Sequence, residues 1–135
     1  MPCEPGTDNQ QMILQEAIAI LEAEAHYSKA HQLKEVIRTA RASDFMSEVL
    51  IEDSVPDILL TGLCNAQVIR TASVFGIKAV IFVRGKLASR QMIDLAVQEN
   101  VVLMCTDYSL YTSCGKLYSH GIRGVTEKEE KNVSK

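Results

Sequence analysis

Three consecutive stretches of the chain repeat one pattern, in which a short apolar run is followed by a polar turn and an amphipathic segment. The apolar runs span 57–61, 79–83 and 101–105 and start about 22 residues apart. Runs of this length, rich in Val, Ile and Leu, are typical of strands covered on both faces. Parallel strands joined by helices need right-handed crossovers. The pattern predicts one three-layer α/β domain, with a mostly parallel sheet of about five strands and helices on both faces.

The amphipathic segments carry helix boundary signals. Helices are expected over 66–75, 90–100 and 110–120, with Ser89 capping the second and Thr106-Asp107 forming a turn and cap before the third. Gly76 and Gly121 suit left-handed positions at helix ends. The side chains expected to face inward are Val68, Ile69, Ala72, Phe75, Met92, Ile93, Ala96, Val97, Leu110, Cys114, Leu117 and Tyr118.

The N-terminal half is less regular. Its residue pattern predicts a helix over 11–25 capped by Asp8 or Asn9, a short strand over 26–28 and a strand over 35–42. Ser43-Asp44 is expected to cap a short helix to Ile51 with Phe45, Met46, Val49 and Leu50 inward. A last short strand is expected over 122–125. The domain boundaries are a flexible tail at 1–10, the α/β domain at 11–125 and a disordered charged tail at 126–135.

Composition argues against several classes of protein. The 135 residues carry a net charge of −3 and are 47% apolar, which is ordinary for one globular domain. No basic run indicates a nucleic-acid partner, and no apolar run approaches the roughly 18 residues that span a bilayer. The N-terminus lacks a secretory signal pattern, and the four cysteines lack zinc or disulfide spacing. We expect a cytoplasmic protein with no nucleic-acid or membrane partner.

The turns after the three strands carry the candidate binding residues. In an open parallel sheet the carboxyl ends of the strands meet at one edge, where ligands bind. Arg84 and Lys86 would attract a phosphate or carboxylate there, helped by the helix N-termini. The alternative is that Gly62 and Gly85 serve turn geometry alone, while Arg84 and Lys86 are solvated or pair with Asp and Glu across a dimer. The candidate ligand-binding residues are Thr61, Gly62, Asn65, Arg84, Gly85, Lys86 and Thr106.

Catalytic and metal sites find little support in the residue pattern. Cys64 lies near a helix start, where a thiol pKa can fall, but no histidine lies in a neighbouring turn to act as its base. Asp107 sits where turns and caps favour aspartate. The three histidines lack metal-ligand spacing. We predict no catalytic residue, no cofactor and no metal; the alternative is a small enzyme of redox or phosphoryl-transfer metabolism that uses Cys64 or Asp107.

Five short strings occur in register along most of the chain: MSEVL at 46–50, TGL at 61–63, VIRTA at 68–72, FVRGK at 82–86 and CGKLY at 114–118. In order and spacing they resemble those of DRTGG domains, and the chain resembles the short, stand-alone form of that domain from Met12 to Ile122. The five-letter string that names the family is absent, and 31–36 replaces the polar segment expected near the second strand.

The resemblance implies an α/β fold similar to the N-terminal domain of HPr kinase/phosphorylase. It further implies a regulatory domain that contributes to homodimer contacts and is often found beside CBS domains, which bind most of the adenine nucleotide in such regions. An adenine nucleotide is the candidate ligand of this chain. Kinase activity would need a Gly-x4-Gly-Lys-Ser/Thr loop, which the chain lacks. We expect a non-catalytic regulatory or adaptor domain that self-associates and senses a nucleotide or other phosphate. Because stand-alone members are often encoded near hydrogenase subunits, the alternative is an interaction subunit of a hydrogenase or NADH-oxidoreductase system with no small ligand.

Overall fold

The core of the protein is a mostly parallel sheet, as predicted. A computed structural model describes residues 11–46 and 55–125. Within these residues the strand order is β2-β7-β6-β5-β4-β8, in which neighbours from β7 to β8 are parallel and β2 is antiparallel to β7. The strands are β2 (Glu24–Tyr27), β7 (Val102–Cys105), β6 (Ala79–Phe82), β5 (Ile58–Thr61), β4 (Thr39–Ala42) and β8 (Arg123–Gly124).

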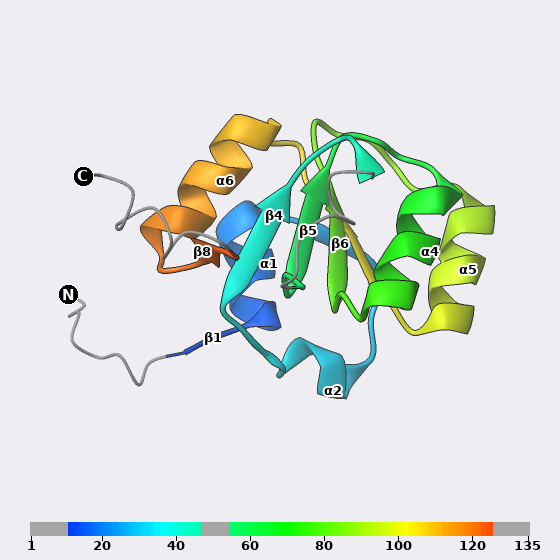
Figure 1. The fold of residues 1–135 in the computed structure, drawn as a ribbon, viewed down its shortest axis with the longest axis horizontal. Helices are drawn as coiled ribbons and strands as arrows, with labels where there is room; N and C mark the ends of the chain where they lie inside the picture. Colours follow the sequence, from blue (N-terminus) through cyan, green and yellow to red (C-terminus); the bar gives the residue numbers. More distant parts are fainter. Residues whose placement is uncertain (1–10, 47–54, 126–135) are drawn as a thin grey trace.

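Helices cover both faces of the sheet, which gives the three layers (Figure 1). Side chains alternate along each buried strand, so that successive residues face opposite layers. Ile58, Leu60 and Ile81 pack with α1 (Leu14–Leu21) and α6 (Leu110–Ser119). Leu59 and Phe82 pack with α4 (Ala66–Phe75) and α5 (Arg90–Glu99). Both faces of the central strands are therefore dry, which explains their continuous apolar sequences.

The helices of the C-terminal half begin and end near their predicted residues. Asn65 and Ser89 cap α4 and α5 by accepting a backbone N–H two or three residues into each helix, and Gly76 ends α4 with φ +77°. Asp107 is not the cap of α6; Ser109, next to the helix, accepts from the Thr112 N–H. Each helix presents only a narrow stripe to the sheet, so three side chains expected inward are exposed: Phe75, Val97 and Tyr118.

The helix expected over 11–25 is wrong at both ends. Met12–Ile13 forms strand β1, which pairs antiparallel with β3 (Val36–Ile37), and α1 ends at Leu21 before a left-handed Glu22. The following residues form β2, which extends the expected short strand toward its N-terminus. These pairings join segments distant in sequence, which helical periodicity does not detect. A short helix, α2 (Ala30–Leu33), lies between β2 and β3.

The strand expected over 35–42 is divided into β3 and β4. The chain turns at Arg38, whose N–H donates to Asp57 Oδ2 at 2.7 Å. Beyond β4, Phe45 is exposed rather than inward as expected. The remaining part of the helix expected there, the caps Asp8 and Asn9, and both terminal tails lie outside the described residues. Among residues 11–46 and 55–125, every helix is too short or too polar to be a candidate membrane span.

Candidate functional site

The carboxyl ends of β4, β5 and β6 meet at one edge of the sheet because the three strands are adjacent and parallel. The residues that follow these strands therefore come close to one another. Asp44 lies just after β4, Gly62 follows β5, and the Arg84–Lys86 turn follows β6. We call the surface formed by Asp44, Gly62, Arg84 and Lys86 the rim.

Gly62 is the centre of the rim. Its N–H donates to Asp44 Oδ1 at 2.7 Å, and its carbonyl oxygen accepts from Lys86 Nζ at 3.1 Å. The Arg84 guanidinium lies against its Cα, since a Cβ placed there would be 2.5 Å from Arg84 Nη2. Only glycine leaves room for this arrangement. The structure thus brings Arg84 and Lys86 together on one buried peptide unit.

The turn that carries the two cations has an unusual backbone. Arg84 has φ +63° and Gly85 has φ +71°, and the Lys86 N–H approaches the Val83 carbonyl oxygen at 3.4 Å, the pattern of a type I′ turn. A left-handed arginine is disfavoured by roughly 1 kcal/mol. It is held there because the Arg84 and Gly85 N–H groups donate to carbonyl oxygens of the next loop, at 2.8 and 2.9 Å. The turn is therefore fixed in place.

Neither cation at the rim forms an ion pair with a carboxylate of residues 11–46 or 55–125, although Asp44 lies at the rim and Asp107 lies beside Gly85. Among these residues, lysine and arginine ion pairs join Lys78 to Glu35 and Asp57, and Arg90 to Asp94, but none involves Arg84 or Lys86. Both rim cations are exposed. Two exposed cations that are not ion-paired can attract an anion, and the planar guanidinium can bind a phosphate through two N–H groups.

Three other predicted site residues shape the loops. The Thr106 hydroxyl is buried and donates to the Leu21 carbonyl oxygen at 2.7 Å, so it points into the core rather than to the rim. Asn65 Oδ1 accepts the Val68 N–H as the α4 cap. The Thr61 hydroxyl donates to Asp44 Oδ1 at 3.0 Å. These residues hold the rim loops, and the side-chain oxygens of all three already have protein partners.

Sequence reasoning missed Asp44 and Phe45 as site residues, because the pattern assigned them to a helix start. Asp44 instead binds the Thr61 hydroxyl and the Gly62 N–H. The signal that could have found both residues is their position directly after a strand, the rule that selected the Arg84 turn.

The thiols near the rim are not activated. Cys64 donates to the Leu87 carbonyl oxygen at 3.5 Å. Burial raises the pKa of the Cys64 thiol, and the nearby Lys86 ammonium lowers it by less. Burial also raises the pKa of Cys105 and Cys114. A thiol with a raised pKa is protonated at neutral pH, which disfavours the alternative of a Cys64 nucleophile. In the described ranges, no three His, Cys, Asp or Glu side chains are grouped as metal ligands.

The raised thiol pKa values predict a loss of stability at alkaline pH. Below the ordinary cysteine value of 9.0 the thiols are protonated in both states and have no effect. As the pH rises above 9.0, the unfolded chain loses thiol protons before the folded chain does, so the free energy of unfolding falls. Urea unfolding at a series of pH values should show this fall, and a shallower one for Cys114→Ala. An equal fall in the variant would contradict the prediction.

Comparison with solved structures finds the same fold in a pyrophosphatase regulatory region. The solved structure contains the CBS and DRTGG domains of the regulatory region of Clostridium perfringens pyrophosphatase, in complex with its activator, diadenosine tetraphosphate. The match has a TM-score of 0.64 and 19% sequence identity over 76% of this chain. The fold is DRTGG-like. The match spans 44% of the pyrophosphatase chain, and no family model and no curated protein sequence matches this chain.

Proposed function

We propose that this DRTGG-like chain is a non-catalytic regulatory domain that binds a phosphate-bearing ligand at the rim. The observation that supports this most directly is the placement of Arg84 and Lys86 against Gly62, without an acidic partner in the described part of the chain. Charge-assisted hydrogen bonds from these two groups suit the oxygens of a phosphate. The fixed backbone of the turn means that little ordering is needed on binding.

The similar solved structure adds a second line of support. That regulatory region binds diadenosine tetraphosphate, a ligand with several phosphates, as its activator. The phosphates of such a ligand could pair with Arg84 and Lys86, which form no ion pair among the described residues. Regulation would then follow if ligand binding changes how the domain contacts a second copy or another protein.

Gly62→Ala tests the site with a single methyl group. The new Cβ would displace the end of the Arg84 side chain, which is flexible, so the fold should remain intact while the guanidinium moves. We expect about a tenfold or larger loss of affinity for ADP and for inorganic pyrophosphate, because one charge-assisted contact is lost. Isothermal titration calorimetry at low salt measures both affinities.

Gly115→Ala is the matched control. Gly115 lies in α6 with open space around it, so a methyl group should leave the affinity unchanged and stabilise the helix by up to about 1 kcal/mol. Urea unfolding of both variants checks that they fold. Unchanged binding by Gly62→Ala, or no binding of either anion to the unaltered protein at millimolar concentration, would refute the proposed site.

A further inference from the structure

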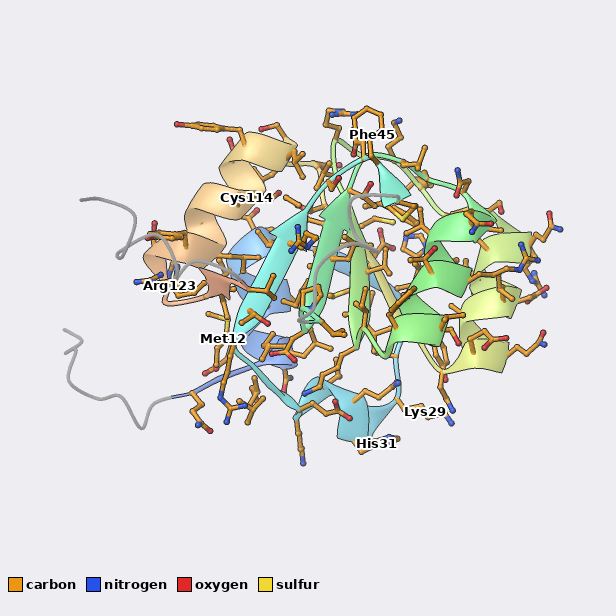
Figure 2. All side chains as sticks on the ribbon, viewed as in Figure 1. Met12, Lys29, His31, Phe45, Cys114 and Arg123 are labelled. Atoms are coloured by element: carbon orange, nitrogen blue, oxygen red, sulfur yellow. The ribbon has the colours of Figure 1, made fainter. Side chains whose placement is uncertain are left out.

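An exposed aromatic side chain stands beside the charged rim. Phe45 follows Asp44 and is 67% exposed. In Figure 2 it lies at the end of the molecule where β4 and β5 finish, whereas Lys29, just before α2, and His31, within α2, lie at the opposite end. The Phe45 N–H donates to Ser43 Oγ at 3.0 Å, and Ser43 is itself buried. The ring is therefore attached to a fixed part of the backbone, where its faces can take a stacked partner.

Asp44 offers a hydrogen-bond acceptor between this ring and the cations. Both of its hydrogen bonds to described residues, from the Thr61 hydroxyl and the Gly62 N–H, use Oδ1. The residue is exposed, so Oδ2 can accept from a ligand. A carboxylate attracts a hydroxyl donor but repels a bare phosphate. Its place at the rim therefore favours a ligand that carries hydroxyl groups as well as negative charge.

The order of these groups follows the order of the strands. The cations follow β6, Gly62 follows β5, and Asp44 and Phe45 follow β4. Adjacent strands are about 4.8 Å apart, so the cations and the aromatic ring are separated by roughly 10 Å along the edge. Along this edge of the sheet, the phosphate-binding cations come first, the hydroxyl-accepting carboxylate second and the aromatic ring third. A nucleotide presents its phosphate, sugar and base in the same order.

We infer, building on the phosphate site proposed above, that the ligand is a nucleotide whose base stacks on Phe45 and whose ribose hydroxyl donates to Asp44. Arg84 and Lys86 bind its phosphates. Stacking on a single ring tolerates any base, so the site selects nucleotides as a class over inorganic phosphates. Asp44 selects ribose over a sugar without hydroxyl groups.

Calorimetric titration with ADP and with inorganic pyrophosphate tests the stacking step. The unaltered protein should bind ADP at least about tenfold more tightly than pyrophosphate. Phe45→Ala should weaken ADP binding by about tenfold and leave pyrophosphate binding unchanged. Phe75→Ala, which removes an exposed ring at the far end of α4, should change neither affinity. Equal affinities for ADP and pyrophosphate, or ADP binding that survives Phe45→Ala unchanged, would overturn the inference.

Asp44→Asn tests the sugar contact, because it keeps an oxygen for Gly62 while removing the charge. The unaltered protein should prefer ADP to its 2′,3′-dideoxy analogue by about fivefold or more. In Asp44→Asn this preference should shrink toward unity. Removing the negative charge should raise the affinity for both analogues, but the ratio of the two affinities still reports on the hydroxyl contact. An unchanged preference would overturn the role of Asp44. The two proposals can be told apart by their failures. If pyrophosphate binds as expected but ADP binds no more tightly, the phosphate site stands and the nucleotide inference fails. If Gly62→Ala changes neither affinity, both proposals fail.

Discussion

Replacing both Arg84 and Lys86 by alanine should lower the affinity for ADP by about a hundredfold, because two charge-assisted contacts of about 1.5 kcal/mol each are lost. Stability should change by less than about 1 kcal/mol, since both side chains are exposed and neither belongs to an ion pair among the described residues. Calorimetric titration at low salt gives the affinity, and urea unfolding gives the stability.

Arg90→Ala is the control for a simple loss of positive charge. Arg90 begins α5, is highly exposed and pairs with Asp94 at 3.4 Å. Its removal should leave ADP affinity within about twofold of the original, because a screened surface charge acts weakly at a distance. A similar loss in Arg84→Ala and Arg90→Ala would mean that ADP responds to net charge, and the rim would not be a specific site.

Phe82→Ala should lower the free energy of unfolding by about 3–5 kcal/mol. Phe82 is fully buried on the central strand β6 and packs against α4 and α5, so truncation leaves a cavity in the core. A domain of this size has a total stability of only about 5–15 kcal/mol. Urea unfolding followed by circular dichroism measures the change.

The control for Phe82→Ala is Phe75→Ala, which removes the same side chain from the end of α4. Phe75 is 40% exposed and should cost well under half as much. Equal losses in the two variants would show that the layer formed by α4 and α5 does not pack on β6 as described. Because both variants lose the same type of side chain, a difference between their losses of stability reports on burial.

Sequence reasoning predicted the segment from β5 to α6 closely, because its signals are local. Strands buried on both faces must be apolar at every position, as in Ala79–Phe82. Caps and left-handed ends are also short-range signals, and the predicted cap Ser89 and the predicted end Gly76 mark α5 and α4 within one residue. The adjacency of β5, β6 and β7 agrees with the tendency of consecutive strands to lie next to each other in a sheet.

The N-terminal half was predicted less well because its structure depends on distant partners. Met12–Ile13 is a strand only through pairing with Val36–Ile37. Glu24–Tyr27 is the antiparallel edge of the sheet because β7, nearly 80 residues later, offers it a partner. Its exposed residues show none of the apolar continuity that marks the central strands.

Sequence reasoning predicted the two cations of the rim, Arg84 and Lys86, but not its acidic residue, Asp44. Arg84 and Lys86 are recognisable because few tripeptides concentrate so much charge after a strand. Asp44 was assigned to a cap, since aspartate has that role often. Its bonds to Thr61 and Gly62 depend on β4 lying next to β5, which only the sheet order establishes.

The anchoring of the Arg84 and Gly85 amides to the loop after β7 has a kinetic consequence. A recognition surface that is already assembled needs no slow rearrangement before a small molecule docks. Association should then proceed in a single step whose rate rises linearly with ligand concentration and falls with added salt. The dissociation rate alone would then set the lifetime of the ligand-bound domain after the free ligand is removed.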